Sequence, residues 1–454
     1  MGSLEFCNTY LLGVTVPIAL AAAGVFFLFK LRAFAFLHPI RVMRTILQRR
    51  STNGISPMRA LSMALAGVLG VGNLVGVSAA IAAGGAGAVF WMWVSATLAM
   101  LVKYAEIVLA VRHRRMGEQG GRGGAMCYIR DAFAGRRAWL GRLLAGVFAA
   151  LCLVDAFSMG CVVQINAVAL SWQDIGGVPT WLTGAVLAVI VFAAGLGGAK
   201  TVSRCTERLI PAMTVGFVVV SLAAIGGRLG AIPTLLRHIC VSAFSPDTTT
   251  QSLLGGLGGF LLSRALRFGT MRGLLSNEAG CGTSPMAHAT ADTTDAAAQG
   301  CLGIVEVFVD THLLCTMTAL VVLLAWEEVS ELGETPMLMT VRAYETLLGP
   351  WAGIFLGVAV LLFGLATLLC WSHYAVESAD WLIGERGRRA GVVRRVCLLL
   401  YCVFCVVGAT VAPSSVWTVS DFAIGAMTLL NLAVLCREHR EVVAATRHFW
   451  RDEK

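Results

Sequence analysis

The sequence predicts an all-α polytopic membrane protein, and three observations support this fold class. Of its 454 residues, 57% are hydrophobic and only 13% are charged, whereas a soluble domain has about 25% charged residues. Apolar runs near the ~20 residues needed to cross hydrocarbon recur along the whole chain. Two of these runs are interrupted by glycines at corresponding places, which is typical of transporters built from internal repeats.

Eleven apolar runs mark the expected transmembrane helices, so we predict about eleven spans. They cover residues 10–29, 60–83, 88–111, 143–171, 180–198, 209–227, 243–266, 301–326, 350–376, 395–412 and 415–436. No cleavable signal peptide is expected before the first run, because the first ten residues lack a basic region and no small-residue cleavage site follows.

The net charge of +9 is explained by orientation and does not indicate a nucleic-acid partner. Basic residues concentrate in alternate loops, such as 30–59 and 112–142, while only Arg228, Arg237 and Arg342 fall in the other set. This is the positive-inside pattern. It predicts a multi-pass protein of the cell (inner) membrane, with the N-terminus outside and the C-terminus in the cytoplasm.

The spans after the first one divide into two sets of five. We expect four segments: an N-terminal helix with a basic loop, a first repeat, a second repeat and a cytoplasmic tail, at residues 1–58, 59–230, 231–436 and 437–454. Five spans reverse the direction of the chain across the membrane. The two sets therefore have opposite topology, which is the inverted-repeat arrangement of many transporters.

The first span of each repeat contains a glycine-rich interruption. The sequence LGVGN occupies 69–73, and GGLGG occupies 255–259 beside Phe260. Exposed backbone at membrane depth is tolerated only where it lines a cavity enclosed by protein. We therefore predict two broken helices that form a site at the membrane midplane, with tight helix packing through glycine as the alternative.

Long motifs along nearly the whole chain resemble the alanine or glycine:cation symporter family, also called the sodium:alanine symporters. They include GISPMRALSMALAGVLGVGN (54–73), GGAGAVFWMWVSATLA (84–99), VVQINAVA (162–169), RGLLSNEAGCGTSPMAHATA (272–291), FVDTHLLCTMTALVVLL (308–324), LFGLATLLCWSHYAVE (362–377) and VWTVSDFAIGAMTLLNL (416–432). The resemblance implies a LeuT-type fold of two inverted five-helix repeats plus one extra N-terminal helix. It also implies sodium- or proton-coupled uptake of small neutral amino acids.

A zwitterionic substrate needs a partner for each of its charges, and broken helices provide both. Free NH groups at half-helix N-termini suit a carboxylate, and free carbonyls suit an ammonium group. Gln164 and Asn166 are about 200° apart on a helix, and the resemblance favours Gln164 as the substrate-facing amide. Trp371 lies on an aromatic stripe that could equally be helix packing. The candidate substrate residues are Gly70, Val71, Gly72, Asn73, Gln164, Gly255, Gly256, Gly258, Gly259, Phe260 and Trp371.

The resemblance also implies an ion site, in which the hydroxyl of Thr367 joins backbone oxygens of Ala66 and Leu69. Asn73 adds a carbonyl oxygen, and oxygen ligands are what a hard cation requires. No cofactor and no metal other than this Na⁺ are expected. Two departures from the family pattern, Val71 for a usual Thr and Ala366 for a usual Ser, each remove a hydroxyl. The coupling ion could therefore be Na⁺ or H⁺.

Ionisable residues within the predicted spans are functional candidates. We expect Lys103 and Glu106, three apart on one helix, to pair. Glu306 and Asp310 are candidates either for a proton relay or for contacts at a helix start.

Three alternatives to a cation symporter are considered. An uncoupled or proton-coupled transporter would have the same fold. A membrane enzyme should show clustered His, Asp or Cys at an interface, and the sequence has no such cluster. An amino-acid sensor usually adds a soluble domain, whereas the tail after the last run is only about 18 residues. The expected partners are a small neutral amino acid and the bilayer, and the sequence is compatible with a monomer.

Overall fold

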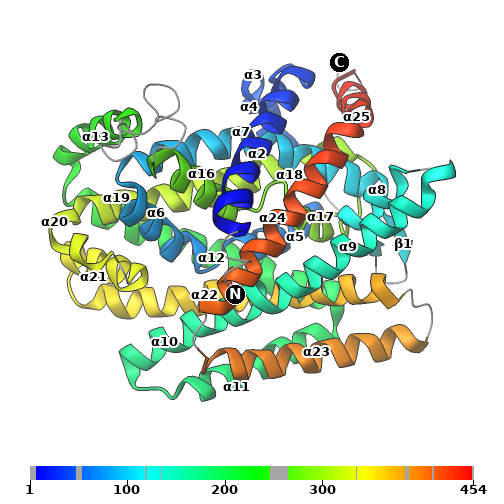
Figure 1. Ribbon diagram of the computed structural model, residues 1–454. Helices are drawn as coiled ribbons and strands as arrows, with labels where there is room; N and C mark the ends of the chain where they lie inside the picture. The colour runs from blue at the N-terminus through cyan, green and yellow to red at the C-terminus, as the bar shows by residue number, and fades with distance from the viewer. Residues whose placement is uncertain are drawn as a thin grey trace.

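The computed structural model describes residues 7–47, 54–117, 120–133, 135–245, 264–333, 335–383, 388–411 and 414–451. These residues form a helical protein with one short hairpin, in which β1 (Arg115–Gly117) pairs antiparallel with β2 (Gly120–Arg122). The helices pack together into one bundle, and the hairpin lies at one end of this bundle (Figure 1). The expectation of an all-α membrane protein is confirmed.

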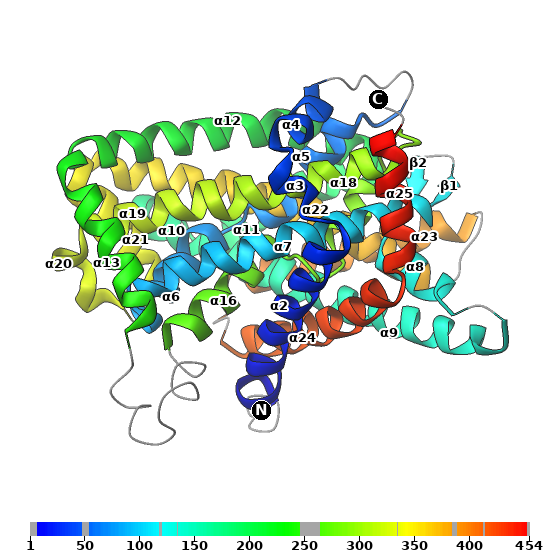
Figure 2. The ribbon, with the colours of Figure 1, turned by 90° about the horizontal axis from the view of Figure 1, so that it is seen from above.

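One helix precedes the repeats. This helix, α2 (Gly13–Lys30), contacts α7 and α24, and it crosses the body of the protein in the view from above (Figure 2). Arg32 and Ala33 then adopt the left-handed conformation, with φ of 55° and 49°. They turn the chain into two short helices, α3 (Phe34–Leu37) and α4 (Pro39–Leu47).

The first repeat begins with a broken helix. Its two halves, α5 and α6, are bent by 54° at the break, and a π-helical turn at Gly72–Gly76 lies between them. A second π-helical turn, Ser158–Val163, joins α9 to α10. The helices of this half are α5 (Pro57–Val68), α6 (Val77–Gly84), α7 (Gly87–Arg112), α8 (Ala125–Asp131), α9 (Ala138–Phe157), α10 (Gln164–Gly176), α11 (Thr180–Leu196) and α12 (Gly198–Gly226).

The second half follows the connecting helix α13 (Ile232–Phe244). A π-helical turn, Phe308–Cys315, joins two of its helices. The helices are α16 (Arg264–Asn277), α17 (Ser284–His288), α18 (Ala296–Val307), α19 (Thr316–Leu324), α20 (Trp326–Val329), α21 (Pro336–Leu348), α22 (Trp351–Ile383), α23 (Arg388–Gly408) and α24 (Ser414–Arg437). The amphipathic helix α25 (His439–Arg451) comes last.

Eight described helices are long and apolar enough to cross a membrane, and α5 with α6 makes a ninth. The shorter apolar helix α11 matches a tenth of the eleven expected spans. The expected span at 243–266 stays a prediction, because 246–263 lie outside the described residues. The next described helix, α16, contacts α7 and α6.

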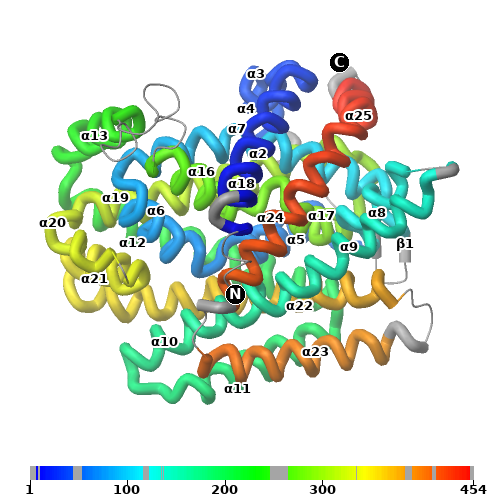
Figure 3. The backbone as a smooth tube through the Cα atoms, viewed as in Figure 1, coloured from blue at the N-terminus to red at the C-terminus, as the bar shows by residue number. Residues whose placement is uncertain are grey.

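Helices α11 and α23 lie side by side at the edge of the body (Figure 3), and small residues allow their close contact. A Cβ atom added to Gly184 would lie 2.8 Å from the Cβ of Ala409, and one added to Gly195 would lie 2.6 Å from Leu398 Cδ2. In a membrane, helix association depends on such close packing, because lipid is as apolar as the helices themselves.

The C-terminal helix α25 is tied to the end of α7 outside the spans. His113 Nε2 lies 3.0 Å from Glu441 Oε2, and His113 Nδ1 lies 3.2 Å from Asp131 Oδ2. The hydrogen bond with Glu441 is the main reason that the pKa of His113 is raised, and the same bond lowers the pKa of Glu441 to about 2. Arg112 also pairs with Glu441.

Candidate substrate and ion site

The first break lies between α5 and α6, and its glycines have different roles. A Cβ atom added to Gly70 would lie 2.8 Å from Gln164 Oε1 and 3.0 Å from Thr367 Oγ1, whereas one added to Gly72 would meet no atom within 4 Å. Gly70 is therefore required by the close approach of α10 and α22. Gly72 instead leaves backbone exposed to open space.

Two carbonyls that the break frees at the end of α5 are approached by side chains of α22. Trp371 Nε1 donates to Gly67 O at 3.2 Å, and Thr367 Oγ1 lies 3.5 Å from Leu69 O while it donates to Phe363 O at 3.1 Å. The expected partners Thr367 and Leu69 are thus brought together, and Ala66 lies fully buried in the last turn of α5. Trp371 is buried behind the break.

Gln164 of α10 also contacts the break. Its Oε1 accepts a hydrogen bond from Val71 N at 3.1 Å. Asn166, in contrast, donates to the carbonyls of Gly408 and Val411 at 3.2 and 2.9 Å. Both side chains line one cavity of about 760 Å³, as do Val71 and Gly72. This cavity, which we call the vestibule, extends from the break to α21.

A second break separates α16 from α17. Glu278, Gly280 and Gly282 all have positive φ, at 50°, 85° and 81°, and glycine takes this conformation with little cost. Asn277 closes the turn, since its Oδ1 accepts from Ala279 N at 3.0 Å. Thr283 Oγ1 donates to Glu278 Oε2 at 2.6 Å.

This break does not coincide with the one expected from the sequence. The predicted residues 255–259 and Phe260 lie outside the described residues, so their proposed role stays a prediction. The interrupted pair that the structure describes in this repeat falls about twenty residues later, at 278–283.

The two breaks meet at Asp310, which lies in the π-helical turn between α18 and α19. Asn73 Nδ2 donates to Asp310 Oδ1 at 2.6 Å. Ser276, near the end of α16, and Thr311 donate to Asp310 Oδ2 at 2.8 and 2.7 Å. All four residues are buried, and Asn73 Oδ1 has no hydrogen-bond partner in the part of the chain that the structure describes.

We call Asn73, Asp310, Ser276 and Thr311 the junction. The sequence predicts a site role for Asn73 but does not indicate its contact with Asp310. The two side chains are 237 positions apart, so no spacing rule could join them. The available signal was an aspartate within an apolar run, which is a functional candidate wherever it occurs in a membrane.

A buried charge cluster fixes α17, the second half of the broken pair. Lys103 Nζ lies 3.3 Å from Glu306 Oε1 and donates to Ser284 Oγ at 2.8 Å. His288 Nε2 lies 2.9 Å from Glu306 Oε2. The expected pairing of Lys103 with Glu106 is therefore wrong: Lys103 contacts the facing helices α17 and α18, and Glu106 accepts instead from Asn431 at 2.8 Å.

Charged side chains from three helices line the vestibule. They are Arg272 of α16, Asp421 of α24 and the exposed Asp174 of α10, in walls that are otherwise largely apolar. The Arg272 guanidinium lies 5.9 Å from the ring centre of Trp417, one turn before Asp421. Among the described residues, Arg272 and Asp421 do not form an ion pair within 4 Å.

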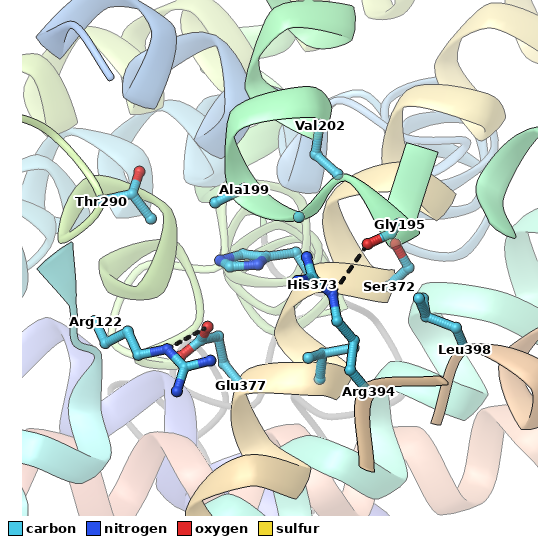
Figure 4. A pocket seen from close by; sticks show the side chains of 12 residues that line it. Arg122, Gly195, Ala199, Val202, Thr290, Ser372, His373, Glu377, Arg394 and Leu398 are labelled. Carbon is cyan, nitrogen blue, oxygen red and sulfur yellow. Dashed lines mark hydrogen bonds and ion pairs between the residues drawn. The ribbon is translucent and has the colours of Figure 1, made fainter. Parts of the chain in front are cut away.

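A much smaller cavity, about 30 Å³, lies near the opposite end of α22 from α21 (Figure 4). The His373 ring points into it from α22. Arg122 of β2 lies 3.6 Å from Glu377 and 2.8 Å from Asp380 of α22, and Arg394 Nε donates to Gly195 O at 3.2 Å. These contacts join the hairpin and α23 to the ends of α22 and α11. Val71 and Gly72 of the first break line the vestibule, whereas no residue of that break lines this smaller cavity.

Comparison with known proteins agrees with this architecture. The Sodium:alanine symporter family model matches residues 2–454. The chain belongs to the sodium:alanine symporter family. It is 32% identical over 452 residues to the sodium/alanine symporter AgcS of Methanococcus maripaludis, covering 97% of this chain and 95% of that one. It is 29% identical over 453 residues to the probable sodium/glutamine symporter GlnT of Bacillus subtilis, covering 98% and 90%.

The fold is also that of a solved transporter. A Na⁺-coupled sialic acid symporter in a substrate-bound outward-open state aligns with a TM-score of 0.58 at 12% identity, over 93% of this chain and 85% of that one. The expected family and LeuT-type fold are thus confirmed. As a member of this family the protein is a multi-pass, cation-coupled amino-acid transporter and not an enzyme.

Proposed function

We propose that this protein carries a small neutral amino acid, such as alanine or glycine, together with Na⁺ across the cytoplasmic membrane. The junction is the observation that carries this proposal. It combines a buried carboxylate, two hydroxyls and the unpartnered Oδ1 of Asn73, next to the vestibule. Oxygen ligands from several helices are what a hard cation requires.

We further propose that the junction takes one Na⁺, with Asn73 Oδ1 and Asp310 as ligands. A second position would use Thr367 with the carbonyl oxygens of Leu69 and Ala66. Both positions contact the first break, so an ion at either one stabilises the bend between α5 and α6. Ion binding and the shape of the substrate site are then coupled through the same backbone.

The substrate would bind beside the first break, against Gly70, Val71 and Gly72. Gln164 fixes this backbone through Val71 N, and the exposed backbone at Gly72 supplies polar groups next to an apolar wall. Arg272 and Asp421 in the vestibule would attract the two charges of an approaching zwitterion. The similarity of the chain to a sodium/alanine symporter supports a small substrate. The similarity to a probable sodium/glutamine symporter makes glutamine the competing candidate.

A second candidate function is proton-coupled transport by the same fold. Val71 and Ala366 lack the hydroxyls that the family usually has at these positions, which would weaken a Na⁺ site. Asp310 would then be the group that carries the proton. In either case the distribution of basic residues supports an orientation with the N-terminus outside and the C-terminus in the cytoplasm.

Counterflow in proteoliposomes tests this proposal. The full-length protein is reconstituted with unlabelled alanine inside, and entry of radiolabelled alanine, glycine, serine and glutamine is followed with and without Na⁺. We expect exchange of the small amino acids that requires Na⁺ at constant pH. Exchange that is independent of Na⁺ but depends on pH would indicate proton coupling instead. Exchange of glutamine alone would overturn the substrate assignment.

A further inference from the structure

A second large cavity, about 740 Å³, lies far from both breaks in the chain, where the end of α2 and the short helices α3 and α4 face α25. These elements lie near one another at one edge of the molecule (Figure 1), and α2 is in contact with α25. Nothing in the transport site uses this cavity. We call it the basic cavity.

The basic cavity is strongly cationic. Lys30, Arg32, Arg41 and Arg447 line it together with one histidine, and none of the described residues that line it is acidic. Positive charges gathered around one cavity repel one another, so the arrangement is complementary to an anion. A phosphate group, which several basic side chains can bind at once, fits this charge.

The backbone that shapes the basic cavity is unusual. Arg32 and Ala33 are consecutive non-glycine residues with positive φ, a conformation that is unfavourable for residues with a side chain. This turn brings α3 back against α7, where the rings of Phe34 and Tyr104 are tilted by 59° with their centres 4.9 Å apart. It also places Arg32 in the wall of the cavity.

The position of the cavity indicates the kind of anion. Lys30 is the last residue of α2, which is a candidate membrane span, so the cavity lies at the end of a transmembrane helix. Three apolar side chains beside it are largely exposed: Phe29 by 76%, Leu37 by 67% and Ile40 by 69%. Helices with basic and exposed apolar residues together, such as α4, lie in the membrane interface.

We propose that the basic cavity binds the headgroup of an anionic phospholipid. The phosphate lies among Lys30, Arg32, Arg41 and Arg447, and the acyl chains lie along the exposed apolar side chains of α2 and α4. The leaflet is the one facing the basic loops, which the charge distribution marks as cytoplasmic. A lipid bound here links the extra N-terminal helix to α25, the last helix of the chain.

Native mass spectrometry of the full-length protein in detergent, titrated with phosphatidylglycerol, tests this proposal. The variant Arg32→Gln/Arg41→Gln/Arg447→Gln removes three charges from the cavity. Each basic side chain near an anionic lipid contributes about fivefold to binding, so we expect affinity to fall by roughly 100-fold. The single variant Arg447→Gln, on the exposed face of α25, should fall by about fivefold and serves if the triple variant does not fold.

The matched control removes three exposed basic residues from the start of α12, as Lys200→Gln/Arg204→Gln/Arg208→Gln. Its net charge equals that of the cavity variant, and we expect its phosphatidylglycerol affinity to match the unaltered protein. Equal loss in both triple variants, no loss in Arg447→Gln, or equal binding of phosphatidylcholine would overturn the proposal. Displacement of phosphatidylglycerol by millimolar inorganic phosphate would identify a free anion as the ligand and would also overturn it.

Discussion

Asp310 is the residue whose replacement tests the ion site most directly. The substitution Asp310→Asn keeps the size of the side chain and removes its charge. In the junction, Asp310 accepts hydrogen bonds from Asn73, Ser276 and Thr311 at 2.6 to 2.8 Å. An asparagine has one acceptor oxygen, so its amide group must also face one of these donors.

The expected loss follows from the charge. A cation about 4 Å from a carboxylate gains about 4 kcal/mol at an effective dielectric constant near 20, which is about 1,000-fold in affinity. The asparagine carbonyl restores part of this attraction. If it restores half, the loss is ~2 kcal/mol, so the Na⁺ concentration for half-maximal uptake should rise by between about 30-fold and 1,000-fold.

The assay is alanine uptake into proteoliposomes over a range of Na⁺ concentrations, with thermal unfolding of the same samples. A bound ion stabilises the folded protein by an amount that grows with the logarithm of the ion concentration above Kd, so Na⁺ should raise the melting temperature of the unaltered protein but not of Asp310→Asn. Asp174→Asn, an exposed acid in the wall of the same vestibule, is the matched control. Unchanged Na⁺ dependence of both uptake and melting in Asp310→Asn would refute the reasoning.

Three further predictions concern other parts of the protein. The double substitution Val71→Thr/Ala366→Ser restores two hydroxyls, each of which contributes a net ~1 kcal/mol. The Na⁺ concentration for half-maximal uptake should therefore fall severalfold. An unchanged Na⁺ concentration would show that these hydroxyls are not ion ligands. Arg272→Gln should raise KM for alanine severalfold with little change in kcat, and Arg272→Lys should restore the original KM. An unchanged KM of Arg272→Gln in uptake assays would show that Arg272 does not attract the substrate in the vestibule. His113→Gln should lower the melting temperature most near pH 5.5 to 6. Glu441 has a lowered pKa, so its contribution to stability is present above pH 4.5 and is lost as the pH falls toward 2. His113 has a raised pKa, so its contribution to stability is present below pH 6.5 and is lost as the pH rises through the raised pKa. An equal difference in melting temperature between His113→Gln and the unaltered protein at pH 6 and at pH 8 would contradict this prediction.

The sequence was sufficient for the first break because its signal is local. Gly70 and Gly72 interrupt an apolar run of membrane length, and Asn73 follows at once. Lipid leaves such a backbone few alternatives to lining a cavity. The family resemblance implies a site role for Gln164 and brings Thr367 to the backbone oxygen of Leu69, but the contact of Gln164 with Val71 was not predicted. These contacts join residues 298 and 93 positions apart, so no local pattern could indicate them.

Charge pairing could not be predicted from helical spacing alone. Lys103 and Glu106 lie three apart on α7, and this spacing allows a pair. The structure offers Lys103 two closer oxygens from other helices, Ser284 Oγ and Glu306 Oε1. In a buried site a charge is stabilised only when several hydrogen bonds satisfy it together, so tertiary contacts decide its partner.

The break between α16 and α17 is marked by backbone conformation more than by glycine content, and the predicted break at 255–259 stays a prediction. A run such as GGLGG is conspicuous in the sequence, but glycine also serves close packing. The interruption that the structure describes uses only Gly280 and Gly282, and a third residue, Glu278, adopts positive φ without being glycine. Glu278 is held there by Thr283, and the flanking Asn277 by Thr311 and Ala279. What the two breaks share is a buried polar side chain held by a hydrogen bond: Asn73 donates to Asp310 in the first, and Glu278 accepts from Thr283 in the second.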